Sequence, residues 1–182
     1  MNGSSLILLG AILGAMQSVD FGGPINKTAY LFATASLANG DYVLMSAVLA
    51  GAIVSPYVTA LSSTIFKSKF SAKERTQGFT NYLIGLAGIS ECAIPYAVKD
   101  PVRVIGSCVI GSAVAGGLSV YFGCRVMAPF GGVFIIPLND SPLGFIAAMC
   151  AGILVGTLLL GFSKKPIQEE TPVEKTSMVD SL

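Results

Sequence analysis

The sequence contains no histidine and no tryptophan, and only 12% of its 182 residues are charged. Without an imidazole, the chain has no histidine base, no histidine metal ligand and no phosphohistidine. A typical soluble domain is about 25% charged, which is roughly twice the fraction found here. The 11 basic and 10 acidic residues nearly cancel, so the composition excludes nucleic-acid binding through a basic face.

Cysteine is also scarce and lacks the spacing of a metal site. The four residues Cys92, Cys108, Cys124 and Cys150 form no CxxC pair, and without histidine no usual zinc ligand set exists. All four lie in apolar surroundings, which predicts buried free thiols. We therefore expect no metal and no cofactor.

Apolar residues dominate what remains. They make up 53% of the chain, and its mean hydropathy is +0.73. This composition indicates an all-α polytopic membrane protein. The long apolar segments are residues 4–19, 42–66, 79–98, 104–122 and 143–162. No Lys or Arg precedes the first of them, so we interpret it as a retained helix rather than a signal peptide, and we expect further chain upstream.

Several stretches are apolar but too rich in Gly and Pro for straight helices. Residues 20–27 read DFGGPINK and precede the half-length apolar stretch 28–38. Residues 123–142 are similarly broken, and Gly85, Gly88 and Pro95 interrupt the segment 79–98. Irregular backbone at membrane depth is tolerated where it lines a cavity. We therefore expect transmembrane helices plus re-entrant hairpins that together form a transport domain.

Basic residues orient the segments through the positive-inside rule. The cluster at 67–75 and the pair Lys164-Lys165 are assigned to the cytoplasm, so the polar tail is cytoplasmic as well. Lys99 and Arg103 are also cytoplasmic if residues 79–98 return to the side they left. A simple five-crossing arrangement would place them outside. We expect a membrane domain over 1–162 and a disordered tail over 163–182.

Glu91 is the one carboxylate well inside an apolar segment. An ionised carboxylate there costs several kcal/mol unless water or a partner satisfies it, which favours a ligand site over a structural role. A carboxylate can accept hydrogen bonds from two adjacent sugar hydroxyls. It would equally suit a cation or a proton, so the residue alone does not select the ligand.

Three motifs resemble one protein family. Residues 10–30, GAILGAMQSVDFGGPINKTAY, residues 88–107, GISECAIPYAVKDPVRVIGS, and residues 128–137, APFGGVFIIP, occur in the order typical of fructose-type enzyme II C components. These are the membrane permeases of the bacterial phosphoenolpyruvate-dependent sugar phosphotransferase system. The resemblance covers about residues 3–162, and a full-length member is roughly twice as long. The chain is therefore similar to the C-terminal half of such a component.

The resemblance implies a sugar-translocating subunit of the inner membrane, which binds fructose or a similar sugar and presents it to a cytosolic B component for phosphorylation. It also implies a cytosolic A component, contact with membrane lipid and a homodimer in the full-length protein. No residue of this chain is expected to carry phosphate. The substrate-binding residues that the resemblance implies are Glu91, Asn26, Asp20, Gly23, Ser90, Asp100 and Arg103.

Two other interpretations remain open. The chain could be an ion-coupled secondary transporter in which Glu91 holds a cation or a proton. It could also be a truncated membrane half without transport activity. Uptake that survives collapse of the ion gradient would exclude the first, and sugar binding by the isolated chain would exclude the second.

Overall fold

The computed structural model describes residues 3–165. Every named element in this range is a helix, as the composition predicted. The α-helices are α1 (Gly3–Met16), α2 (Pro24–Ala38), α3 (Val43–Ile65), α4 (Ala72–Leu86), α5 (Ile94–Lys99), α6 (Pro101–Tyr121) and α7 (Pro142–Ser163). Three short 3-10 helices connect them: η1 (Lys67–Lys69), η2 (Ser90–Ala93) and η3 (Gly132–Leu138).

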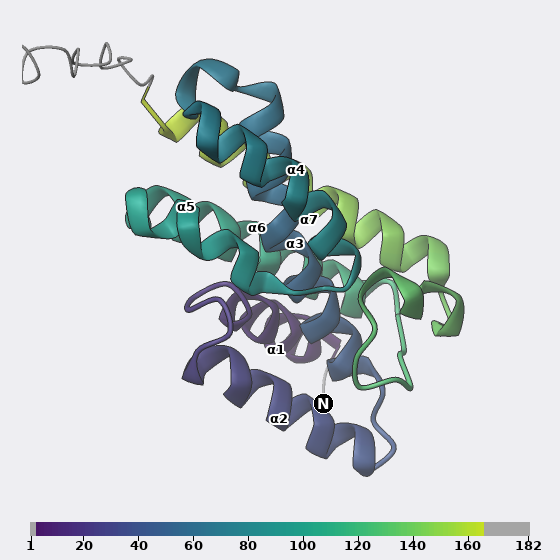
Figure 1. Ribbon diagram of the computed structural model, residues 1–182. Helices are drawn as coiled ribbons and strands as arrows, with labels where there is room; N and C mark the ends of the chain where they lie inside the picture. Colours follow the sequence, from purple (N-terminus) through teal and green to yellow (C-terminus); the bar gives the residue numbers. More distant parts are fainter. Residues whose placement is uncertain (1–2, 166–182) are drawn as a thin grey trace, which may run out of the picture.

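Helix α3 forms the centre of the structure. It contacts α1, α2, α4, α6 and α7, and Figure 1 shows it running through the middle of the bundle. Its buried side chains include Met45, Val48, Ile53 and Val58, which form the core together with residues of the surrounding helices. The short elements η1, η2 and η3 between the helices also pack against this central helix.

Glycines allow the helices to approach closely. A β-carbon added at Gly111 would lie 2.6 Å from the carbonyl oxygen of Gly152 on α7, and one added at Gly51 would lie 2.6 Å from that of Gly14 on α1. Both separations are below van der Waals contact. Small residues thus bring the backbones of α1, α3, α6 and α7 together, as they do in many membrane helix pairs.

Three of the helices in the described range are long and apolar enough to cross a membrane: α3, α6 and α7. Helix α1 is apolar but ends at Met16, where the chain turns, so the predicted span over 4–19 is too long. Its 14 residues reach about 21 Å, short of the ~30 Å hydrocarbon core. The predicted re-entrant hairpins stay a prediction.

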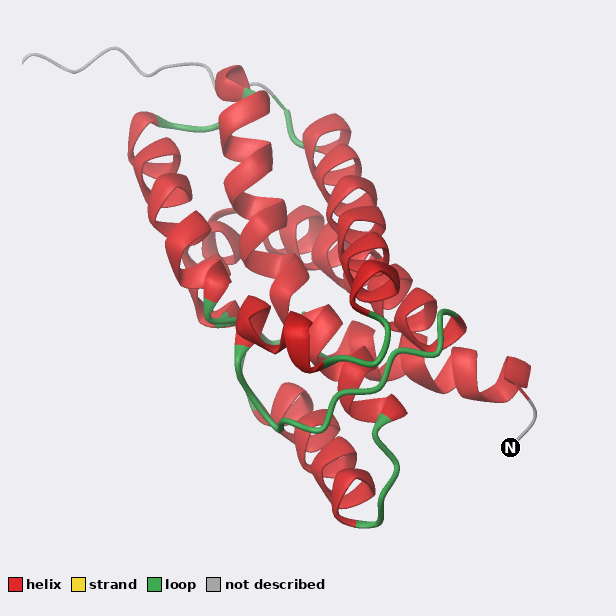
Figure 2. Cartoon of the chain, turned by 90° about the vertical axis from the view of Figure 1, so that its right-hand side faces the viewer, coloured by secondary structure: helices red, strands yellow, loops and turns green. Residues whose placement is uncertain are grey.

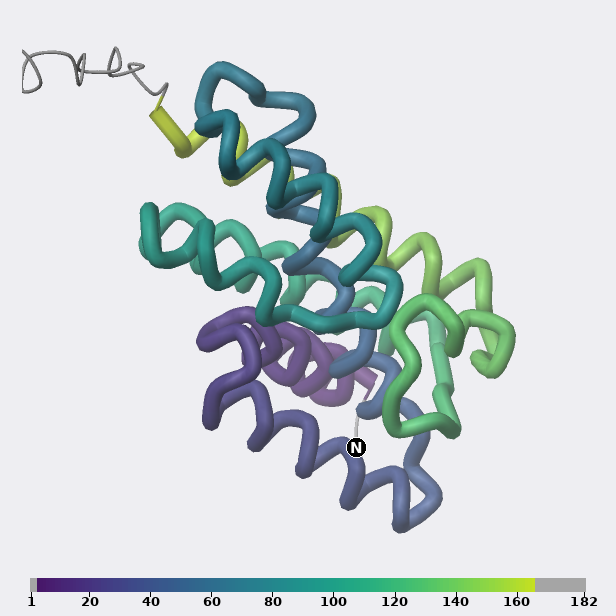
Figure 3. Tube along the Cα trace, in the orientation of Figure 1, coloured from purple at the N-terminus to yellow at the C-terminus, as the bar shows by residue number. Residues whose placement is uncertain are grey.

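The connection between α6 and α7 is irregular, as the Gly- and Pro-rich stretch 123–142 predicted. It contains an isolated bridge between Val126 and Asn139 and then η3. Figure 2 shows it as a long loop, and Figure 3 shows the same stretch, in green, folded beside the start of α7.

Two expectations need correction. The basic cluster at 67–75, expected as a loop before the apolar segment 79–98, is not all loop, because α4 already begins at Ala72 with a capping box between Ser71 and Glu74. Cys150 is exposed on α7, whereas the other three cysteines are buried. Hydropathy could not show that Cys150 is exposed, because a residue buried in the protein and a residue on an outward apolar face both have apolar neighbours in the sequence. The predicted disordered tail lies, from residue 166 onward, outside the described residues.

Candidate functional site

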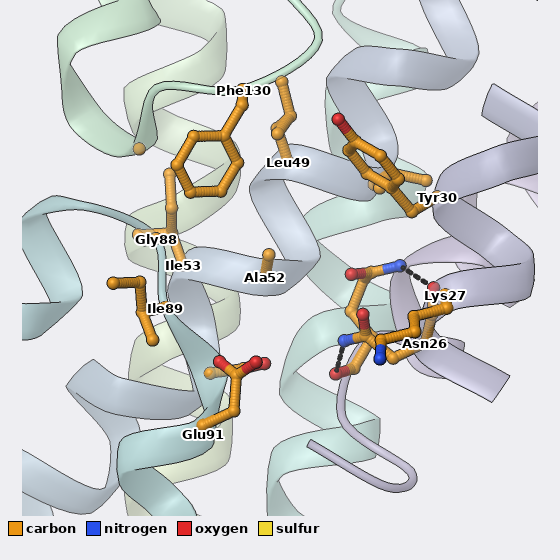
Figure 4. A pocket seen from close by; sticks show the side chains of 14 residues that line it. Asn26, Lys27, Tyr30, Leu49, Ala52, Ile53, Gly88, Ile89, Glu91 and Phe130 are labelled. Atoms are coloured by element: carbon orange, nitrogen blue, oxygen red, sulfur yellow. Dashed lines mark hydrogen bonds between the residues drawn. The ribbon is translucent and has the colours of Figure 1, made fainter. Parts of the chain in front are cut away.

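A cavity of about 410 Å³ lies where the three sequence motifs meet. Figure 4 shows Glu91 on one wall and Asn26 and Lys27 on the facing wall, with side chains of α3 between them. The lining residues are Gln17, Asn26, Lys27, Tyr30, Val48, Leu49, Ala52, Ile53, Gly88, Ile89, Ser90, Glu91, Phe130 and Gly132. A few polar groups on an apolar wall are typical of small-molecule sites.

Glu91 belongs to η2, the turn that connects α4 to α5. Gly88 precedes it with φ of 75°, which reverses the chain after α4. No other residue of the described range forms an ion pair or a side-chain hydrogen bond with the Glu91 carboxylate, and Figure 4 shows this group facing the cavity. Its oxygens are therefore available to accept hydrogen bonds from a ligand.

The backbone of the 20–23 loop contacts this carboxylate directly. Gly22 has φ of 97°, and a β-carbon at this position would lie 2.5 Å from Oε1 of Glu91. Any other residue there would both strain the backbone and collide with the carboxylate. The first and second motifs thus lie close together, and a side chain at position 22 would fit only if the Glu91 carboxylate moved.

Asp20 and Asn26 hold this loop in shape. The Asp20 carboxylate accepts hydrogen bonds from the backbone N–H groups of Ile25 (2.7 Å) and Asn26 (3.1 Å) at the start of α2. Nδ2 of Asn26 donates to the carbonyl of Gln17 at 2.7 Å, and Nε2 of Gln17 donates to the carbonyl of Asn26 at 3.3 Å. Asp20 therefore caps a helix and lies outside the lining, while Asn26 lines the cavity.

Gly23 likewise serves the cap. A β-carbon there would lie 2.5 Å from Oδ2 of Asp20, so glycine leaves room for the capping carboxylate. Gly23 is not among the lining residues.

A buried amide on α4 holds the Glu91 turn from behind. Nδ2 of Asn81 donates to the carbonyl of Cys92 (3.1 Å) and to Oγ1 of Thr59 on α3 (3.0 Å), and its Oδ1 accepts from Nε2 of Gln77. Sequence reasoning missed Asn81. A lone amide in the apolar run 79–86 was the available signal, because buried polar groups need partners.

The third motif closes the cavity. A β-carbon at Gly132 would collide with the carbonyl oxygen of Leu86, and one at Gly88 would lie 3.1 Å from Cα of Gly132. The start of η3 thus packs on the turn that precedes Glu91, and Phe130 reaches the cavity from the loop just before η3. Sequence reasoning identified the segment but also missed Gln17, Lys27 and Tyr30 as lining residues.

Of the remaining predicted residues, one lines the cavity and two do not. Ser90 is buried and lines the cavity. Asp100 and Arg103 do not line it, because they pair with each other at 3.0 Å across the first turn of α6. In the described range no group of three or more His, Cys, Asp or Glu residues could hold a metal ion.

The fold and this cavity define a class: a helical, multi-pass membrane protein with a cavity between broken segments and a central helix. The comparisons with known proteins refine it. The chain is 42% identical over 166 residues, 91% of its length, to the "PTS system fructose-specific EIIABC component" of Bacillus subtilis. It is 43% identical over 166 residues to the "Fructose permease IIC component" of Bacillus amyloliquefaciens. It is 44% identical over 164 residues to the "PTS system fructose-specific EIIC component" of Haloferax volcanii.

The chain is therefore homologous to the fructose-specific C components of the phosphotransferase system, as the motifs predicted. It spans 26% of the first of these relatives, 54% of the second and 44% of the third. No family model matches the chain. No solved structure matches it either.

Proposed function

We propose that this chain is the sugar-binding part of a fructose-type C component, which moves the sugar across the membrane and presents it to a cytosolic B component for phosphorylation. The observation that carries the proposal is the Glu91 carboxylate, which faces a cavity of about 410 Å³ without a partner from the described residues. The relatives are named as fructose systems, and these names supply the substrate class.

The chemistry of the lining suits a small polyol. The Glu91 carboxylate accepts hydrogen bonds from two neighbouring hydroxyls, and the side chains of Asn26, Lys27 and Ser90 add donors and further acceptors. Apolar lining residues such as Ile53 and Phe130 pack against the C–H faces of the sugar. Fructose or a similar monosaccharide is the proposed ligand.

The predicted site residues take two roles in this proposal. Glu91, Asn26 and Ser90 bind the sugar, and Asp20 and Gly23 hold the loop that positions Asn26 and Gly22. Asp100 and Arg103 form a pair at the start of α6 and are assigned no contact with the sugar.

Phosphate must come from outside the chain. The sequence has no histidine, three cysteines are buried, and the fourth lies on the apolar helix α7. None of them occupies an exposed basic loop of the kind that activates a thiolate. We therefore assign the phosphate to A and B components, and labelling from phosphoenolpyruvate should leave residues 1–182 unmodified. Stable phosphate on the chain would contradict this.

The ion pairs support one orientation. Nζ of Lys164 lies 3.1 Å from Oε1 of Glu74, and Nζ of Lys99 lies 3.6 Å from Oε2. All three basic clusters therefore gather at one end of the molecule, which by the positive-inside rule is the cytoplasmic end of a protein in the bacterial inner membrane. This favours a segment 79–98 that returns to the side it left, and a cytoplasmic C-terminal tail. A membrane domain over 1–162 and a homodimer of the full-length protein complete the proposal.

Equilibrium dialysis of labelled fructose against the purified chain in detergent tests the proposal. Glu91→Gln keeps the side-chain volume but removes the charge, and charge-assisted hydrogen bonds contribute about 1.5–3 kcal/mol. The fructose Kd should therefore rise at least about tenfold. Asp140→Asn is the matched control, because Asp140 is exposed and lies outside the cavity lining. Equal binding by wild type and Glu91→Gln would refute the proposed role.

A further inference from the structure

A second cavity, of about 500 Å³, lies at the junction of α3, η1 and α4. Its lining differs from that of the first cavity, because it contains two cations, Lys67 and Arg75, and a set of hydroxyl groups from α3 and α4. Phe79 forms its apolar edge. The cavity adjoins the end of the membrane-length helix α3, at Ile65.

The positive charge of this cavity is not neutralised within residues 3–165. Glu74 lies next to Arg75 in the sequence, but its carboxylate is buried and faces Lys164 and Lys99 instead. Lys67 and Arg75 form no ion pair and no side-chain hydrogen bond in the same range. Two cations at one cavity repel each other unless an anion joins them.

The donors suit a phosphate group. Arg75 offers a fork of N–H groups and Lys67 a point charge, which are the two side chains that most often hold phosphate. The hydroxyls of Thr64 and Thr76 donate to backbone carbonyls of their own helices, so the two cations supply the main attraction. The hydroxyl of Thr80 completes the polar lining.

An apolar stripe leads away from the cavity along α4. Phe79 is 76% exposed and Leu83 is 67% exposed, and Leu86 is exposed as well. The spacing of four and three residues places these side chains on one face of the helix. A basic cavity at the end of a membrane-length helix, followed by an exposed apolar stripe, matches an amphiphile with an anionic head and a hydrocarbon tail.

We infer that this cavity binds the headgroup phosphate of an anionic phospholipid, with an acyl chain along the Phe79–Leu83 stripe. The inference rests on the membrane assignment and not on the sugar site. Both cations contact the phosphate group, and the lipid occupies the groove between the end of α3 and α4. Near a membrane surface each Lys or Arg contributes about 1 kcal/mol to the attraction of anionic lipid.

Native mass spectrometry of the purified chain, titrated with phosphatidylglycerol and, separately, phosphatidylcholine, tests this site. Wild type should retain one phosphatidylglycerol in preference to phosphatidylcholine. Lys67→Gln/Arg75→Gln should weaken phosphatidylglycerol binding about tenfold or more. Lys73→Gln/Lys165→Gln removes two exposed charges outside the cavity lining and should leave binding within about twofold. Melting temperatures of both double variants establish that they fold.

Three results would overturn the inference. Equal losses in the two double variants would indicate diffuse attraction to the basic end of the molecule rather than a site. Equal retention of phosphatidylglycerol and phosphatidylcholine would show that the anionic headgroup is not recognised. Displacement of phosphatidylglycerol by millimolar inorganic phosphate would assign the cavity to a free phosphate group instead of a lipid.

Discussion

Two carboxylates, Glu91 and Glu74, lie on broken or terminal backbone but in opposite environments. Glu91 faces a cavity and has no ion-pair partner in the described range. Glu74 is 4% exposed, lies within 4 Å of two lysine ammonium groups and accepts hydrogen bonds from Ser71. Folding therefore leaves the Glu91 carboxylate available for a ligand, whereas the Glu74 carboxylate already has its partners within the chain.

The environment of Glu74 also sets its pKa. Burial raises the pKa of this carboxyl. The hydrogen bonds from Ser71 and the charge of Lys164 lower the pKa by more than burial raises it, so the pKa lies below its usual value. The ion pair joins the end of α7 to the start of α4, and Lys99 adds the end of α5. Glu74 is thus a stabilising group far from the sugar site proposed at Glu91.

The largest effect should come from Glu74→Gln. This change leaves the buried Lys164 ammonium without a counter-charge, which typically costs about 3 kcal/mol of unfolding free energy. Thermal denaturation of the detergent-solubilised chain measures it. Lys99→Gln is the control, because Lys99 is 50% exposed and its loss should cost less than about 1 kcal/mol. Equal melting temperatures for Glu74→Gln and wild type would mean that the pair stabilises nothing.

Asn81→Ala should lower both the stability of the chain and its affinity for fructose. It removes the donor that the Cys92 carbonyl and Thr59 share, at a cost of about 2 kcal/mol in stability, and it frees the turn that carries Glu91. Melting and fructose dialysis should both change, whereas Asn39→Ala, at an exposed amide, should change neither. If Asn81→Ala lowered the melting temperature without changing the fructose affinity, Asn81 would have no role in positioning Glu91.

Gly22→Ala should disturb the cavity in addition to straining the backbone. The added methyl would displace the Glu91 carboxylate, so we expect the fructose Kd to rise about tenfold, or about 1.4 kcal/mol. Gly40→Ala provides the matched control, because Gly40 also has a positive φ, of 85°, but has open space around its Cα. A similar affinity in both variants would refute the contact between the loop and Glu91.

The smallest effect concerns pH. Because the pKa of Glu74 is lower in the folded chain, its stabilising contribution is complete above the pKa of the unfolded chain and is lost as the pH falls through the folded value. The melting temperatures of wild type and Glu74→Gln should therefore differ fully at pH 7 and approach each other only as the pH falls below about 4. If the difference in melting temperature between wild type and Glu74→Gln grew as the pH fell, ionised Glu74 would not be the stabilising form.

The sequence predicted the long helices well, because runs such as 42–66 and 143–162 are apolar and contain no charged residue, although Pro56 lies within the first. It placed the start of α4 too late, although Ser71 and Glu74 carry the spacing of a capping box. The end of α1 was placed too far along the chain, since Gln17 and Ser18 leave the helix while the apolar pattern continues to Val19.

For the candidate site, the sequence identified Glu91 and the three broken motifs but not their contacts. The approach of Gly22 to Glu91 and of Gly132 to Leu86 depends on tertiary packing, which no local pattern encodes. The same holds for Glu74 and Lys164, which are 90 residues apart in the chain. Lys27 and Tyr30 were missed because their side chains face the cavity only once α2 packs beside α3.

The most direct test compares Glu91→Gln and Glu74→Gln in one experiment that records both the fructose Kd and the melting temperature. The account predicts opposite results: Glu91→Gln loses at least about tenfold in affinity at an unchanged melting temperature, while Glu74→Gln melts lower and binds fructose as wild type does. If Glu91→Gln bound fructose normally, or if both variants lost affinity equally, the assignment of the cavity to the sugar would be wrong.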